Sequence, residues 1–177
     1  FNEEGYLFKY LKAHPEDIRS KMIKDQTGSA FAGGAQGYYP GKYPGQEGSS
    51  KPTYVNNPKI VRIAEMYLIA AEAEYYLNNV DDAIDWINEL NDARIEGYDW
   101  VEPEEVEDPI QYLIDQYKIE FFTENQIAFA YWRNKRTVTA MNGVLTVPYN
   151  DKLAIFPLPQ SEINCNPNLV QNEGYGR

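Results

Sequence analysis

Two amphipathic helices joined by a tight turn are the pattern that most constrains this fold. Asn57 followed by a proline is a typical helix start, because asparagine caps backbone N–H groups and proline needs no donor at the first helical position. We expect helices over residues 58–77 and 81–96, with Asn78-Asn79 as the turn between them. Such a pair packs antiparallel. Apolar residues at helical spacing line one face of each helix: Ile60, Ala64, Tyr67, Leu68, Ala71 and Tyr75, then Ala83, Ile84, Ile87 and Leu90.

A third helix is predicted where Asp108 and Pro109 repeat the cap-and-proline device. The apolar spacing continues from Ile110 to about Trp132, so we expect one helix over this range. In the helix pair, the turn length and the small Ala71 are similar to one tetratricopeptide unit. The sequence therefore predicts a mainly helical fold with tetratricopeptide-like helix pairs and long loops.

The C-terminal part has a different pattern. Alternating residues over 137–141 and 144–147 flank Asn142-Gly143, a dipeptide that readily adopts the positive φ angles of a type I′ turn. This pattern predicts a small β-hairpin, to which residues 153–156 can add a strand. The following residues are rich in Pro and Asn and predict an ordered, extended tail.

Residues 1–57 are expected to form a loop-rich segment with a short helix, whose weak pattern follows Pro15. From Gln26 the composition changes to Gly, Ser, Pro and Tyr, which cannot sustain helical periodicity. A loop of this length is usually functional or disordered. Its prolines and aromatic residues favour an ordered loop that presents aromatic side chains: Phe31, Tyr38, Tyr39, Tyr43 and Tyr54.

The composition limits the possible ligands. Acidic residues outnumber basic ones 27 to 16, a formal net charge of −11, which makes nucleic acid and anionic membranes poor partners. Fifteen residues are tyrosines. A tyrosine combines a flat apolar face with a hydroxyl, so this excess suits stacking on polar rings such as sugars, although core packing explains any one tyrosine equally well.

Catalytic and metal-binding residues are scarce. Cys165 is the one cysteine and His14 the one histidine, and His14 lies in a polar stretch typical of a solvated surface position. Glu120 and Glu124 lie one turn apart, which suggests a glycosidase carboxyl pair, but side chains on one helix face do not span a substrate cleft. We therefore favour a structural role for this pair, and we expect no catalytic residue, metal or cofactor.

Three stretches carry further motifs in a fixed order. The first is PKIVRIAEMYLIAAEAEYYL, with Arg62 followed by Ala-Glu, Tyr-Leu and Ala-Glu-Ala. The second is YKIEFFTENQIAFAYWRNKR, with Glu120, Glu124 and Arg133. The third and most specific is IFPLPQSEINCNPNLVQNEGY, with its prolines, Asn-Pro and Gln-Asn. Together they resemble the C-terminal part of the SusD/RagB family of outer-membrane nutrient-binding lipoproteins, over about residues 58–175.

This resemblance implies a binding protein and not an enzyme. Members look like helical lids that hold glycans or peptides at the cell-surface face of the outer membrane, above a SusC-like TonB-dependent transporter. The family is usually much longer than this chain, which implies that the lipid-anchored N-terminal part lies outside this sequence. On this basis we expect residues 58–177 to form the SusD/RagB-like helical region and to make one structural unit with residues 1–57.

The ligand-binding residues are predicted from loop position and composition, since no family motif fixes them. A glycan or oligosaccharide ligand would stack on exposed tyrosines of the Gly/Tyr loop, with a second group in the acidic loop that follows the helix pair. Two alternatives remain: a peptide-binding member of the same family, and a tetratricopeptide-type protein-interaction scaffold. The candidate residues are Tyr38, Tyr39, Tyr43 and Tyr54, then Tyr98 and Trp100.

Overall fold

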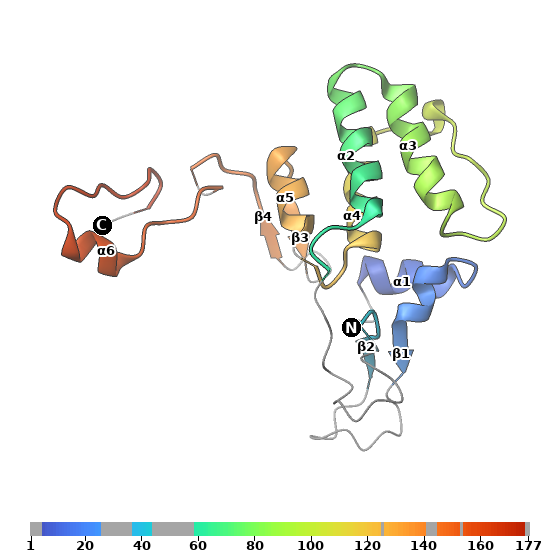
Figure 1. Ribbon diagram of the computed structural model, residues 1–177, viewed down its shortest axis with the longest axis horizontal. Helices are drawn as coiled ribbons and strands as arrows, with labels where there is room; N and C mark the ends of the chain where they lie inside the picture. Colours follow the sequence, from blue (N-terminus) through green and yellow to red (C-terminus); the bar gives the residue numbers. More distant parts are fainter. Residues whose placement is uncertain are drawn as a thin grey trace. The chain divides into compact units, whose positions relative to one another are not determined.

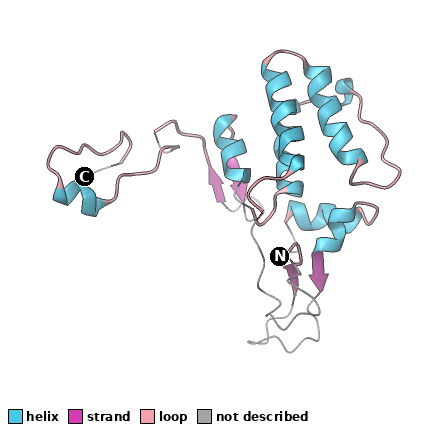
Figure 2. Cartoon of the chain, viewed as in Figure 1, coloured by secondary structure: helices cyan, strands magenta, loops and turns pink. Residues whose placement is uncertain are grey.

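The computed structural model describes residues 5–25, 37–43, 59–124, 126–140, 145–152 and 154–175. It is mainly helical, as predicted, with two short two-stranded sheets among these residues (Figures 1 and 2). The chain divides into two compact units, residues 1–127 and 128–177. The division predicted at residue 57 stays a prediction.

No helix in the described ranges combines the length and the apolar character that crossing a membrane requires.

The predicted helix pair is confirmed. Helices α2 (Ile63–Tyr76) and α3 (Val80–Asp92) lie side by side, and the turn between them places Asn78 at a φ of 65° (Figure 1). The predicted start is wrong, because residues 59–62 are not helical and α2 begins five residues later than expected. The proposed cap at Asn57 lies outside the described residues.

The third predicted helix is broken in two. Asp108 caps α4 (Pro109–Glu120) as expected, with its Oδ1 accepting from the Gln111 amide at 3.1 Å. Thr123 then adopts a φ of 66°, and α5 (Gln126–Arg133) follows. The break is stabilised because Lys42 and Arg62 donate to the terminal carbonyl oxygen of Glu120, at 2.7 and 2.8 Å, which replaces lost helical hydrogen bonds.

A helical segment does follow Pro15 as predicted, but it is a short 3₁₀ helix, and the α-helix of this region, which was not predicted, precedes the proline. Helix α1 (Tyr6–Ala13) comes first, and the 3₁₀ helix η1 (Ile18–Met22) follows with Asp17 as its cap. Strands β1 (Ile23–Asp25) and β2 (Tyr38–Pro40) then pair antiparallel, with Ile23 opposite Pro40. Three residues of the predicted loop are thus a strand.

The core of the first unit lies between α1, α2, α3 and α4. Residues of α1 and β1 form one apolar cluster with residues at and just after the end of α4: Phe8, Leu11, Ile23, Ile119 and Phe122. The predicted apolar faces of the helix pair are buried at Ala64, Leu68, Ala71, Ala83, Ile84, Ile87 and Leu90. Burial of the apolar faces of α2 and α3 fixes α4 against the helix pair.

The 3₁₀ helix η2 (Pro103–Glu105) belongs to the connection from α3 to α4.

The second unit contains the predicted hairpin, in which β3 (Val138–Ala140) pairs antiparallel with β4 (Leu145–Val147). Its expected turn, Asn142-Gly143, lies outside the described residues. The predicted strand over residues 153–156 is wrong for the described residues 154–156. The tail contains a short helix, α6 (Gln160–Cys165), where an extended path was expected. Side-chain amides join distant residues of the tail to one another: Gln171 Nε2 donates to the Leu158 carbonyl at 3.0 Å.

Candidate functional site

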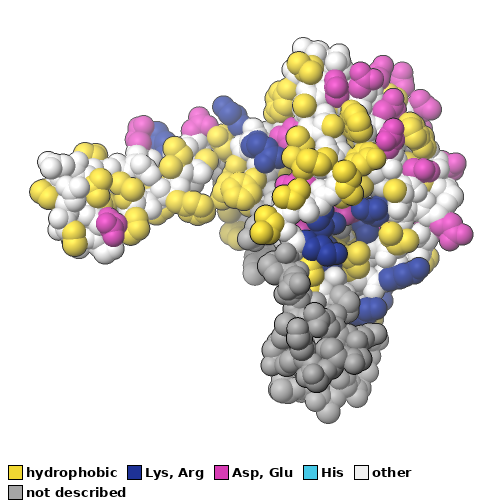
Figure 3. All heavy atoms as spheres, viewed as in Figure 1, with side chains coloured by type: hydrophobic (Ala, Val, Ile, Leu, Met, Phe, Trp, Pro, Cys, Tyr) yellow, Lys and Arg dark blue, Asp and Glu magenta, His cyan; other side chains and the backbone are white. Residues whose placement is uncertain are grey.

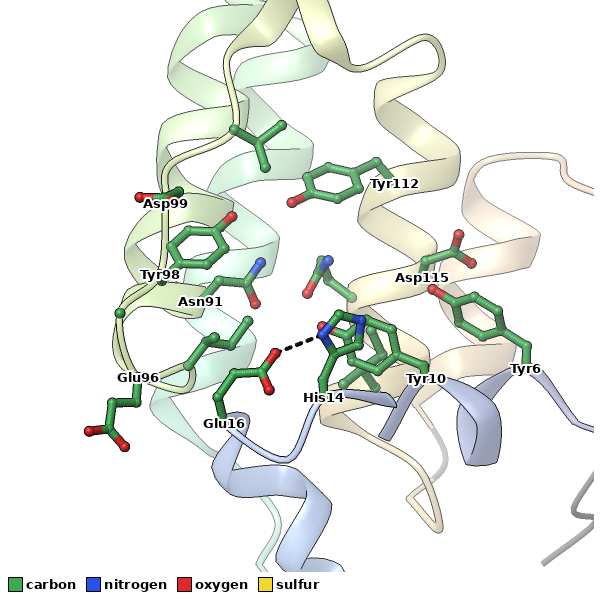
Figure 4. Close-up of a pocket in the computed structure, with 15 residues that line it drawn as sticks. Tyr6, Tyr10, His14, Glu16, Asn91, Glu96, Tyr98, Asp99, Tyr112 and Asp115 are labelled. Carbon is green, nitrogen blue, oxygen red and sulfur yellow. Dashed lines mark hydrogen bonds and ion pairs between the residues drawn. The ribbon is translucent and has the colours of Figure 1, made fainter. Parts of the chain in front are cut away.

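A pocket of about 400 Å³ lies in the first unit between α1, α4 and the segment that follows α3. Figure 4 shows that aromatic side chains from all three elements project toward it. The pocket therefore depends on tertiary packing and not on any one loop. Its ring-bearing lining residues are Tyr6, Tyr10, His14, Tyr98 and Tyr112.

One wall is a row of three rings on α1 and its C-terminus. Tyr6, Tyr10 and His14 are spaced four residues apart, so they lie on one helix face. The ring centroids of Tyr6 and Tyr10 are 6.2 Å apart, and those of Tyr10 and His14 are 4.5 Å apart. His14 Nδ1 contacts Glu16 Oε1 at 2.8 Å, which orients its ring. The wall thus presents a continuous aromatic strip.

The opposite wall is the segment after α3, and Asn88 holds it in place. This asparagine is buried, and its Nδ2 donates to the Val101 carbonyl at 2.9 Å. Its Oδ1 accepts from the Tyr98 hydroxyl at 2.9 Å and from the Val101 amide at 3.1 Å. One side chain therefore fixes both the backbone of this segment and the tyrosine that it presents to the pocket.

Three tyrosines of the pocket have a raised pKa, so their hydroxyls stay protonated. Burial, with the Asp115 carboxylate, raises the pKa of Tyr6 to about 12. Burial and the hydrogen bond with Tyr98 also raise the pKa of Tyr112. Burial likewise raises the pKa of Tyr10, despite the opposing charge of Arg19. At neutral pH Tyr6, Tyr10 and Tyr112 are neutral phenols, which both donate and accept hydrogen bonds.

Amide side chains complete the lining. Asn91 Oδ1 accepts from Arg19 Nη2 at 3.2 Å, so this amide is fixed from behind. Gln116 also lines the pocket, is 5% exposed, and its Oε1 has no hydrogen-bond partner. A buried acceptor of this kind is costly to leave unpaired. The pocket therefore contains a hydrogen-bond acceptor that a ligand hydroxyl could satisfy.

The carboxyl pair considered for catalysis lies elsewhere, in a buried ion network. Glu120 is 4% exposed and contacts the guanidinium groups of Arg62 at 2.7 Å, Arg94 at 3.1 Å and Arg19 at 3.5 Å. Glu124 pairs with Arg62 at 3.2 Å and with Lys42. These contacts account for both carboxylates as parts of the structure.

The electrostatics agree with a structural role for this network. Burial alone would raise the pKa of Glu120, but hydrogen bonds and charge from Arg94 and Arg62 outweigh it, and the pKa is lowered. A glycosidase acid needs the opposite shift. Arg62 also lies 4.3 Å from the centre of the Phe121 ring. Among the described residues, no cluster of His, Cys, Asp and Glu could hold a metal ion.

Comparison with known proteins now identifies the family. The SusD family model matches residues 19–148 of the chain. The chain belongs to the SusD family. The match begins before the motifs that carry the resemblance and ends before the third of them, directly after the hairpin.

Individual relatives agree with this assignment. The chain is 30% identical over 126 residues to the starch-binding protein SusD of Bacteroides thetaiotaomicron, a match that covers 66% of this chain and 21% of that protein. A SusD superfamily structure from the same species superposes with a TM-score of 0.74 at 26% identity, covering 93% of this chain and 39% of the other. One from Bacteroides vulgatus gives 0.72 at 23% identity, covering 96% and 38%. This SusD-family chain thus spans well under half the length of these relatives.

The predicted ligand-binding residues fall in different surroundings. Tyr98 lines the pocket, whereas Trp100, 48% exposed, is outside its lining. Tyr38 packs against Phe8, with ring centroids 4.8 Å apart, and beneath Lys12. Tyr39 lies in β2, and Tyr43 is half-buried, with burial and the Glu124 charge raising its pKa. Tyr54 lies outside the described residues.

Sequence reasoning missed three of the pocket's tyrosines. Tyr6 and Tyr10 were available as a four-residue spacing that continues to His14, but the helix was expected after Pro15 and not before it. Tyr112 carries no local signal beyond its place in α4. These residues meet through the packing of segments about a hundred positions apart in the sequence, which periodicity does not report.

Proposed function

We propose that this SusD-family chain captures a nutrient, an oligosaccharide in the first instance, without chemically changing it. The tyrosine pocket is the proposed site. The observation that carries the proposal is the row of rings on α1, opposite the hydroxyls of Tyr98 and Tyr112 (Figure 4). Sugar rings have apolar C–H faces and polar edges, so they match a pocket that offers both ring faces and hydroxyls.

Two further observations support this proposal. A relative, SusD of Bacteroides thetaiotaomicron, is a starch-binding protein. The carboxylates that could serve hydrolysis, Glu120 and Glu124, are both held in ion pairs.

We extend the proposal to delivery of the nutrient to a SusC-like TonB-dependent transporter at the cell-surface face of the outer membrane. Protease treatment of intact cells, and co-purification with a transporter, test location and partner separately.

Calorimetric titration with maltohexaose tests the binding site. Tyr6→Ala removes a ring that is 51% exposed, so it should leave the fold intact and weaken binding about tenfold. Tyr76→Ala is the matched control, because this tyrosine is on α2, is 58% exposed and is outside the pocket lining. Circular dichroism of each variant checks folding.

The outcomes separate the proposal from its alternatives. Weaker binding by Tyr6→Ala, with Tyr76→Ala unchanged, supports capture of a saccharide in the pocket. Equal binding by both variants would place the ligand elsewhere. If the folded wild type binds short peptides and no saccharide, the chain is a peptide receptor or an interaction scaffold instead.

A further inference from the structure

We infer that the tyrosine pocket selects saccharides that carry no negative charge over uronic or sulfated ones. This inference rests on the proposed function and adds the chemical class of the ligand. It follows from two independent features of the lining. One is the unpartnered acceptor of Gln116, and the other is the sign of the charges around the pocket.

Gln116 is a lining residue of the pocket with an unpaired acceptor. Its Oε1 is buried and has no hydrogen-bond partner, and the residue is 5% exposed. Because Oε1 has almost no accessible surface, a sugar hydroxyl can become its missing partner once the Gln116 side chain turns toward the pocket. A carboxylate or sulfate group offers only acceptors at neutral pH, so an anionic sugar can pair with Oε1 only through its remaining hydroxyls. The acceptor therefore favours a hydroxyl at this position over an anionic group.

The charges of the lining act in the same direction. The described lining residues include four carboxylates and no lysine or arginine: Glu16, Glu96, Asp99 and Asp115. Asp115 is paired with Lys118 at 2.7 Å, and Glu16 contacts His14. Arg19, which holds Asn91, is itself paired with Asp17 at 2.7 Å. These two cations, Lys118 and Arg19, are thus already matched by carboxylates.

Glu96 and Asp99 leave the pocket with a negative rim. Figure 4 shows their carboxylates turned away from the pocket centre, so they act through their field and do not contact a ligand directly. Both residues belong to the lining, and charges interact over about 10 Å at moderate salt, so they affect a ligand in the pocket. On the face drawn in Figure 3, acidic side chains also gather over α3 and the segment after it. An anionic sugar must approach against this field.

The test compares two hexasaccharides, neutral maltohexaose and anionic hexagalacturonate, by calorimetry in low salt. We expect maltohexaose to bind at least tenfold more tightly. Glu96→Gln with Asp99→Asn should narrow this preference about threefold, because it removes two rim charges. The matched control is Asp85→Asn with Glu89→Gln, which removes two exposed α3 charges outside the lining and should narrow the preference less than the rim variant does.

A second pair of variants tests the acceptor. Gln116→Leu should weaken maltohexaose binding about fivefold. Gln126→Leu is its control, since Gln126 Oε1 is also buried and unpartnered but is not in the pocket lining. Equal affinity for the two hexasaccharides, or full binding by Gln116→Leu, would overturn this inference while leaving saccharide capture intact. Binding of neither hexasaccharide by the folded chain would overturn both.

Discussion

Two buried polar side chains on α4, one turn apart, have opposite surroundings. Glu120 contacts three arginines, whereas Gln116 lines the tyrosine pocket and its Oε1 has no hydrogen-bond partner. They are buried to the same degree, at 4% and 5% exposure. Burial alone therefore does not distinguish a structural polar group from a binding one. The two are distinguished by whether all their hydrogen bonds are made, because a satisfied network stabilises the fold and an unsatisfied group remains available to a ligand.

The ion network also explains how the first unit is assembled. Glu120 is contacted by Arg19 from η1, Arg62 before α2 and Arg94 after α3. One carboxylate thus joins three segments that are distant in the sequence. By contrast, the pocket side of α4 is lined by rings and amides, which leave space between the segments.

The largest effect should come from breaking the network. Glu120→Gln leaves three guanidinium groups facing a neutral amide, so we expect the free energy of unfolding to fall by about 3–5 kcal/mol. Urea denaturation monitored by circular dichroism measures this change. Asp115→Asn is the control, because its pair with Lys118 is partly exposed and should contribute less than about 1 kcal/mol. An equal loss of unfolding free energy in Glu120→Gln and Asp115→Asn would contradict the contrast between the two sides of α4.

A smaller effect is expected at the wall of the pocket. Asn88→Ala removes three hydrogen bonds to the segment after α3 and should lower the free energy of unfolding by about 2 kcal/mol. Hydrogen exchange provides a local measurement, because the Val101 amide donates to Asn88 Oδ1 and should exchange faster in the variant. Unchanged protection of that amide would contradict the role assigned to Asn88.

The pH dependence of stability should follow the network. The folded-state pKa of Glu120 is lowered, so its contribution is complete above the unfolded value of about 4.3 and is lost as the pH falls through the folded pKa. Unfolding followed between about pH 6 and pH 3 should show a steeper loss of stability on the acid side in wild type than in Glu120→Gln. Parallel profiles would contradict the assignment.

The smallest effect on stability is expected at Gln116. Since its Oε1 makes no hydrogen bond in the protein, Gln116→Leu should change the free energy of unfolding by less than about 1 kcal/mol, or increase it. Urea denaturation of this variant beside Glu120→Gln sharpens the comparison. A loss as large as that at Glu120 would mean that Gln116 is a structural residue.

The parts of the fold that were predicted from sequence are those that local patterns encode. The apolar faces of α2 and α3, the Asp108 cap and the β3–β4 hairpin each depend on neighbouring residues. The break after α4 could not be predicted in this way. The apolar spacing continues through Thr123, and the groups that stabilise the break, Lys42 and Arg62, come from elsewhere in the chain.

The same distinction holds for the candidate site. Composition drew attention to tyrosine and to Tyr98, but not to the rings that Tyr98 faces. Tyr38 shows the limit of that argument, because its ring packs on Phe8 beside the core cluster. Loop position and residue type suggest which side chains suit a ligand. Only the packing of α1 against α4 and the segment after α3 shows which of them converge.

The most direct test of the account is to observe the tyrosine rings themselves during binding. With ¹³C-labelled tyrosine, titration with maltohexaose should shift the ring resonances of Tyr6, Tyr10, Tyr98 and Tyr112 together, with one saturation curve. The ring resonance of Tyr76, on α2 outside the pocket, should not move. Shifts confined to other tyrosines, or saturable binding with none of the four affected, would contradict the claim that this pocket captures the saccharide.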